Sequence, residues 1–125
     1  MNHSSFKHWL DTLGQAWITR NPKTVANICA EKVLYFETPF DKPLVSKKEV
    51  EKIWQEVPNS QKDIEFSYKI VSVNQEIGVA KWRASFTRLP SGIRDTLDGV
   101  YFVKLDNNGL CKEFHQWWVV RPNCV

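Results

Sequence analysis

Two carboxylates that lie among aromatic residues are the best candidates for chemistry in this sequence. Glu37 lies in the segment YFETPF, and Asp98 lies in LDGVYF, where Tyr101 adds a phenol as a third candidate. A carboxylate that leans into an apolar cavity has its pKa raised by desolvation, so it can act as an acid or a base near neutral pH. The alternative, which we favour for both carboxylates, is an ion pair with Arg83 or Arg94.

The sequence contains no motif for metal, phosphate or nucleophilic chemistry. No second ligand at zinc spacing accompanies any of the three histidines. There is no glycine-rich phosphate loop, no nucleophile elbow and no Cys–His constellation. We therefore expect neither a metal nor another cofactor.

The charge and the aromatic content narrow the class of protein. The formal net charge of +3 is scattered, and no run of like charge is longer than Lys47-Lys48. Nucleic-acid binding would cluster these charges on one face, so we expect no nucleic-acid partner. Six tryptophans, seven phenylalanines and three tyrosines in 125 residues indicate a thick core or a pocket for flat apolar ligands. The length suits a single domain over residues 1–125.

The cysteines and the hydropathy suggest a location. Cys29, Cys111 and Cys124 form no C-x-x-C pair and cannot all pair within one chain. This usage favours a reducing compartment, so we expect a cytosolic protein. No apolar stretch approaches the roughly 20 residues that cross a bilayer, and the first residues lack the pattern of a secretory leader. We therefore expect no association with a membrane.

The N-terminal half has the apolar spacing of three helices. The first should cover residues 5–20. The second should begin at Pro22 and bury Cys29. The third should begin at the cap residue Ser46 and end at Pro58.

The spacing of apolar residues changes to a period of two after Pro58, which predicts strands. Before it, VLYFETPF predicts a strand interrupted by Pro39. After it come four long antiparallel strands, joined by turns at 74–76, 89–92 and 106–109. Strands of this length twist the sheet into a curve, and the helices can cover its concave face. The sequence therefore predicts an α+β fold.

The last strand has large apolar residues on both of its faces. Gln116 and Trp118 should point to one side, and His115, Trp117 and Val119 to the other. One face should line an interior, and the other should meet a second surface such as another copy of the chain. Gln116 is informative, because an interior amide needs hydrogen-bond partners that an apolar core does not supply.

The order of these elements and the pieces YFETPFDKP, SKKEVEKIW, LDGVYFVKLDNNG and EFHQWW resemble the SnoaL-like branch of the nuclear transport factor 2-like superfamily. The resemblance covers residues 5–121. It implies a cone-shaped α+β barrel with a pocket between helices and sheet, and a dimer formed through the outer face of the sheet. That fold hosts isomerases, cyclases, hydrolases, dehydratases and non-catalytic binding modules.

Alignment with the ketosteroid isomerases of this superfamily places their functional positions on the chain. Their general base falls on Thr38, their oxyanion-binding carboxylic acid on Tyr101, their helical tyrosine near Gly14 and their pocket tryptophan on Trp118. A threonine hydroxyl cannot act as the base, so we reject steroid isomerisation by that mechanism. An Asp–Arg–Asp set of the epoxide-hydrolase type is a poor match, because the available residues crowd on one strand.

The same alignment implies which side chains face the pocket, and it turns Glu37 and Asp98 outward. The implied wall consists of Trp17, Phe36, Thr38, Trp54, Trp82, Phe86, Tyr101, Phe114, Gln116 and Trp118. The tryptophans could equally fill a solid core. The residues that alternate with these wall residues point to the other face of the sheet and form a mixed apolar and charged patch. We interpret this patch as the core of a homodimer interface. This interface would include Val100, Phe102, His115, Trp117 and Val119.

Two functions remain open. The first is a SnoaL-like protein that binds or transforms a small apolar, oxygen-bearing metabolite, which requires a cavity of at least ~300 Å³. The second is a non-catalytic homodimeric association module with a packed barrel. The polar wall residues Gln116, Thr38 and Tyr101 favour the first.

Overall fold

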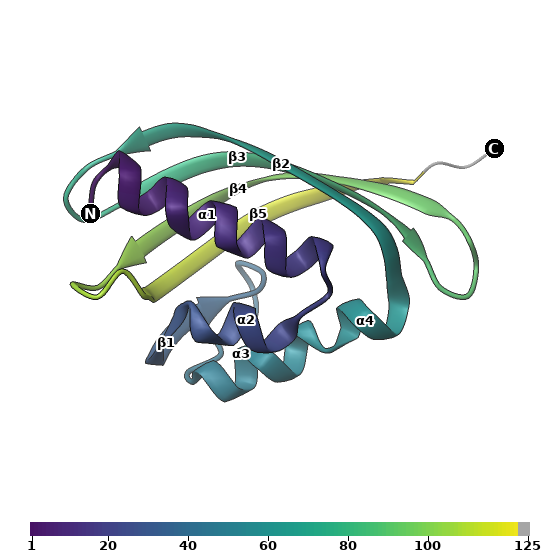
Figure 1. Ribbon diagram of the computed structural model, residues 1–125, viewed down its shortest axis with the longest axis horizontal. Coiled ribbons are helices and arrows are strands. Elements are labelled where there is room, and N and C mark those ends of the chain that lie inside the picture. Colours follow the sequence, from purple (N-terminus) through teal and green to yellow (C-terminus); the bar gives the residue numbers. More distant parts are fainter. Residues whose placement is uncertain (123–125) are drawn as a thin grey trace.

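A strongly curved five-stranded sheet arches over four helices in the computed structural model, which describes residues 1–122 (Figure 1). The sheet is cone-like but does not close into a full barrel. This is the predicted α+β class, with helices against the concave face. The elements in chain order are α1 (His3–Ile18), α2 (Pro22–Asn27), β1 (Cys29–Phe36), α3 (Lys47–Trp54), α4 (Glu56–Ser60), β2 (Gln61–Val73), β3 (Gly78–Arg88), β4 (Arg94–Leu105) and β5 (Cys111–Pro122).

The strands lie in the order β1-β5-β4-β3-β2. The four long strands β2 to β5 form consecutive antiparallel pairs, as the alternating pattern predicts. Strand β1 pairs with β5 in parallel, so the first strand of the chain lies beside the last. This long-range pairing brings the segment after β1 to the C-terminal part of β5.

The helices differ from the prediction at three places. Helix α1 begins at His3 because Asn2, rather than a serine, accepts the hydrogen bond from Ser5 N–H. Cys29 belongs to β1 and not to the second helix. The third predicted helix is two helices, since the chain turns at Gln55 and α4 contains Pro58. Proline is tolerated there because the first turn of a helix has no intrahelical partners for its N–H groups.

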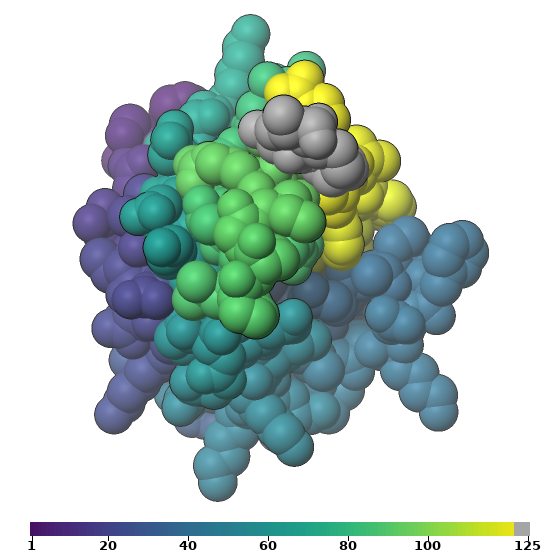
Figure 2. Space-filling view, turned by 90° about the vertical axis from the view of Figure 1, so that its right-hand side faces the viewer, coloured from purple at the N-terminus to yellow at the C-terminus, as the bar shows by residue number. Residues whose placement is uncertain are grey.

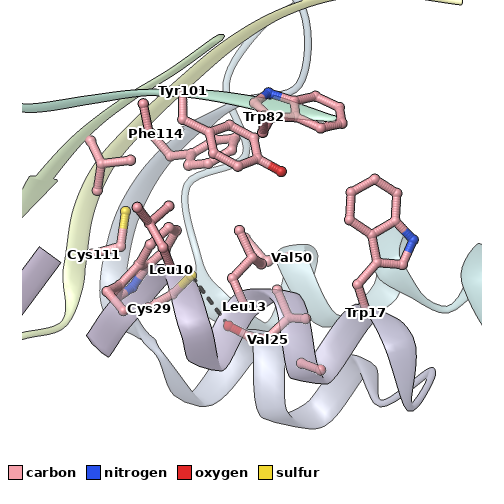
Figure 3. Packing of buried hydrophobic residues seen from close by; sticks show 14 of the residues in the cluster. Leu10, Leu13, Trp17, Val25, Cys29, Val50, Trp82, Tyr101, Cys111 and Phe114 are labelled. Atoms are coloured by element: carbon pink, nitrogen blue, oxygen red, sulfur yellow. Dashed lines mark hydrogen bonds between the residues drawn. The ribbon is translucent and has the colours of Figure 1, made fainter. Parts of the chain in front are cut away.

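Aromatic and aliphatic side chains pack together in the interior between α1 and the sheet (Figure 3). The rings of Trp82 and Tyr101 stack with centroids 4.9 Å apart, and those of Tyr35 and Phe114 stack at 4.3 Å. Gly99 permits the first stack, because a β-carbon there would lie 2.9 Å from the Trp82 indole.

The buried thiols of Cys29 and Cys111 are free. Cys124 lies outside the described residues. No described helix is long and apolar enough to cross a membrane. The cytosolic location stays a prediction. Residues 1–122 contain no cluster of side chains suited to hold a metal ion.

Candidate functional site

A cavity of about 330 Å³ lies between the helices and the concave face of the sheet. Figure 2 looks onto the end of the molecule where the β3–β4 connection (green) lies between α4 (teal) and the end of β5 (yellow), with the segment after β1 (blue) beside them. The lining residues come from α1, α3, α4, the segment after β1 and all five strands. They are Trp17, Tyr35, Glu37, Ile53, Trp54, Glu56, Val57, Gln61, Trp82, Phe86, Arg88, Leu97, Tyr101, Gln116 and Trp118.

Most of the residues predicted for the pocket wall line this cavity. Trp17, Trp54, Trp82, Phe86, Tyr101, Gln116 and Trp118 do so. Trp118 lies where the cavity opens, with 39% of its surface exposed, and not in an enclosed void as its strand pattern suggested. Phe114 is buried but packs on Tyr35 and does not reach the cavity.

The predicted sidedness of β1 is wrong. Tyr35 is level with Phe114 in the parallel β1–β5 pair, and Phe36 is level with His115. Residues level with one another in neighbouring strands share a face, so Tyr35 points inward and Phe36 stacks on His115 outside. The hydroxyl of Thr38 donates a hydrogen bond to Asp41 instead of facing the cavity.

Glu37 faces the cavity, contrary to the expectation that it points outward. Within the described residues its carboxyl has no hydrogen bond and no ion pair. Desolvation raises the pKa of Glu37 from 4.5 to about 7, and the nearby charges of Glu56 and Asp41 add to this increase. This carboxyl can therefore exchange a proton near neutral pH.

The arginines that we expected to neutralise Glu37 have other partners. Arg83 Nη2 lies 2.8 Å from the Asp98 carboxylate, so Asp98 forms the expected ion pair and is unsuited to catalysis. Arg94 pairs with Glu65 at 3.0 Å. Neither guanidinium is left to pair with Glu37.

Gln116 holds the end of β1 in place. Its side-chain amide donates a hydrogen bond of 3.0 Å to the backbone carbonyl of Glu37, and only 9% of its surface is exposed. This contact supplies the partner that an interior amide requires. Gln116 thereby fixes the backbone that directs the Glu37 carboxyl into the cavity.

Two buried tyrosines face the same space with different roles. The Tyr35 hydroxyl accepts a hydrogen bond of 3.0 Å from the Trp54 indole. The Tyr101 hydroxyl points away from the sheet toward the helices (Figure 3) and has no partner within residues 1–122. Burial, and then the charge of Glu37, raises the pKa of Tyr101, so the phenol stays protonated and can donate a hydrogen bond to a ligand.

Several lining residues have no place in the pocket wall that the sequence predicts. Arg88 follows Phe86 by two positions on β3, so strand alternation could have placed it on the same face. Its charge is neutralised by the buried Asp95, and its guanidinium lies 5.1 Å from the centre of the Phe86 ring. No local signal predicted Glu56 or Gln61, because both come from the unexpected turn into α4 and β2.

A curved sheet over helices, with a cavity of small-molecule size between them, defines the nuclear transport factor 2-like superfamily. The sequence profile of the SnoaL-like domain family matches residues 8–114. The chain therefore belongs to the SnoaL-like domain family, and it has a pocket of the kind that accepts small molecules. No curated protein sequence matches the chain.

Solved structures of enzymes share the fold. A putative scytalone dehydratase from Novosphingobium aromaticivorans has a TM-score of 0.81 at 11% identity, over 98% of this chain and 87% of that chain. The ketosteroid isomerase from Mycobacterium sp. has a TM-score of 0.78 at 11% identity, over 95% and 98%. An epoxide hydrolase from M. tuberculosis has a TM-score of 0.71 at 10% identity, over 93% and 84%. At these identities the likeness concerns the fold alone.

Proposed function

We propose that the protein is an enzyme that moves a proton on an apolar, oxygen-bearing small molecule, with Glu37 as the acid–base group. The observation that carries this proposal is the unpaired Glu37 carboxyl in an aromatic cavity, with a pKa of about 7. A group with this pKa exists in both protonation states at neutral pH, which is the condition for efficient acid–base catalysis.

The cavity supplies the remaining parts of such a reaction. The aromatic walls bind the apolar body of the substrate. The ionised Glu37 removes a proton from a carbon next to a carbonyl group, and the Tyr101 hydroxyl donates a hydrogen bond to the oxygen on which negative charge develops. Glu37 then returns the proton to another carbon, which gives an isomer, or to a departing hydroxyl group, which gives water and an alkene.

The cavity also argues against the alternative function, a non-catalytic association module with a packed barrel. A packed association module needs a filled barrel, whereas about 330 Å³ lies open between the sheet and the helices. Space of this size, lined with aromatic residues and a few polar groups, favours a ligand. We therefore retain the enzyme as the proposed function and not the packed module.

A carbon acid of suitable size tests this proposal. Nitrobenzisoxazole is flat and aromatic, and its ring opens to a coloured phenolate when a base removes its carbon-bound proton. We expect the protein to accelerate this reaction, with a rate that rises with pH and is half-maximal near pH 7, because only the ionised Glu37 accepts the proton. The measurement is absorbance against pH. A rate that matches free acetate and has no inflection near pH 7 would contradict the proposal.

We also propose that the protein forms a homodimer through the convex face of the sheet. Cross-strand pairing places Val100 beside Trp117 and Phe102 beside His115, and Val119 follows on the same face. Trp117 is 47% exposed and Val119 is 70% exposed. Apolar residues gathered in this way mark an interface more often than a free surface.

Trp117→Asp is expected to convert the dimer to a monomer, because it places a charge at the centre of the apolar patch. Light scattering at micromolar concentration should then report half the mass of the unaltered protein. Val71→Asp is the matched control, since Val71 is 56% exposed on β2, the strand at the opposite edge of the sheet from β1. An unaltered protein that is already a monomer would contradict the proposed dimer.

A further inference from the structure

The sign of the charge in the cavity is opposite to that of the whole chain. The protein carries a formal net charge of +3, yet the lining contains the carboxyls of Glu37 and Glu56. Within the described residues neither carboxyl forms an ion pair. Arg88 is the cation of the lining, and Asp95 already neutralises it. The lining therefore carries uncompensated negative charge from Glu56, and from Glu37 whenever its carboxyl is ionised.

The walls of the cavity suit a positive charge. Trp17, Trp54, Trp82 and Trp118 all line it, and tryptophan has the ring face that attracts cations most strongly. The guanidinium of Arg88 over the ring of Phe86 shows that a cation already packs against this wall. An anionic ligand would meet both the carboxyls and the negative ring faces, so the same features exclude it.

A second observation indicates that a ligand completes the cavity. The Tyr101 residue is 1% exposed, and its hydroxyl points into the cavity without a hydrogen-bond partner within residues 1–122. This hydroxyl is therefore available to donate a hydrogen bond to an oxygen atom of a bound molecule. The site thus offers a hydrogen-bond donor at its interior and the Glu56 carboxyl nearer its opening, where Glu56 and Trp118 are both exposed.

We propose that the natural ligand is an organic cation: an apolar body with an oxygen that meets Tyr101 and a positively charged nitrogen that lies at the opening near Glu56 and Trp118. This inference rests on the proposed function only in taking the same cavity as the substrate site. The nitrogen would gain both the attraction of the carboxyls and that of the indole faces. Its charge would also favour the ionised form of Glu37, because an opposite charge nearby stabilises the carboxylate.

A pair of probes of equal shape tests this inference. Benzyltrimethylammonium and its uncharged isostere, neopentylbenzene, differ only in the replacement of a quaternary nitrogen by carbon. We expect the dissociation constant of the cation to be lower by about tenfold, measured by the quenching of tryptophan fluorescence. A preference of less than about threefold would overturn the inference.

Variants of Glu37 and Glu56 test whether their carboxyls cause the preference for the cationic probe. The double variant Glu37→Gln/Glu56→Gln should lose most of the preference for the cation and retain its affinity for the neutral isostere. Glu51→Gln is the matched control, because Glu51 lies on exposed α3 surface and does not line the cavity. A preference that the double variant leaves unchanged would overturn the inference. The ring opening of nitrobenzisoxazole involves a neutral compound, so it fails or succeeds independently of this result.

Discussion

Glu37→Gln is expected to slow the ring opening of nitrobenzisoxazole by at least about 100-fold, because a positioned acid–base group contributes rate factors of this size. Glutamine has nearly the shape of glutamate but cannot accept the proton. The cavity and the hydrogen bond from Gln116 to the Glu37 backbone carbonyl should therefore persist. The measurement is the rate constant at pH 8, where the unaltered carboxyl is ionised. Glu76→Gln, in the exposed β2–β3 turn, is the control.

The same variant has a stability signature that excludes misfolding as the cause. Folding raises the pKa of Glu37 from 4.5 to about 7, so the native state binds this proton more tightly than the unfolded chain. Its contribution to stability is fully present below about pH 4.5 and is lost as the pH rises to about 7. The loss amounts to at most about 3 kcal/mol. Glu37→Gln should therefore be inactive and yet more stable than the unaltered protein at pH 8.

Urea denaturation at pH 5 and at pH 8 measures this effect. The free energy of unfolding of the unaltered protein should fall between the two values by more than that of Glu37→Gln. If the variant keeps its activity, Glu37 is not the acid–base group. If the two proteins show the same dependence on pH, the carboxyl is not desolvated as the structure indicates.

Gly99→Ala is expected to lower the free energy of unfolding by about 3 kcal/mol, since overpacking of a tight core costs energy of this order. Its β-carbon would contact the backbone carbonyl oxygen of Trp117 and lie 2.9 Å from the Trp82 indole. A backbone oxygen in the β4–β5 pair cannot move without disturbing the ladder. We also expect the displaced indole to reshape the cavity, which weakened binding of a flat aromatic probe would report.

Gly14→Ala provides the matched comparison. The added β-carbon would lie 2.6 Å from an atom of the Phe66 ring, but here the contact is with a side chain that is only partly buried. Alanine also favours the helix by about 1 kcal/mol relative to glycine. We therefore expect a loss of less than half that of Gly99→Ala, measured by urea denaturation. Equal losses of unfolding free energy in the two variants would show that the β4–β5 backbone accommodates the added methyl group as easily as the Phe66 ring does.

The fold could be predicted from the sequence where local periodicity determines it. The alternation in 61–122 gave the long strands and the correct sides of His115, Gln116 and Trp117, because each strand pairs with its neighbour in sequence. Capping chemistry located the start of α3 at Ser46. The split at Gln55 was missed, because Pro58 serves equally well after a helix or inside a first turn.

The site could be predicted only in part. Its aromatic walls follow from alternation along the long strands. The proposed acid–base group, Glu37, lies just after β1, whose sidedness depends on a parallel partner at the far end of the chain. The register of this pairing shifts between Cys29 and Leu34, so counting residues along the sequence cannot give the orientation of Glu37. Alignment with distant relatives favoured Thr38 over Glu37, although only Glu37 faces the cavity.

The hydrogen bond from Gln116 to the carbonyl of Glu37 joins positions 79 residues apart in the sequence. While the chain is being synthesised, Glu37 emerges long before β5 exists, and until then it is an ordinary solvated carboxylate. Its unusual proton affinity arises when the C-terminal strand docks beside β1. The proton affinity that the proposed function requires is therefore a product of the completed fold, and a chain that lacks β5 does not have it.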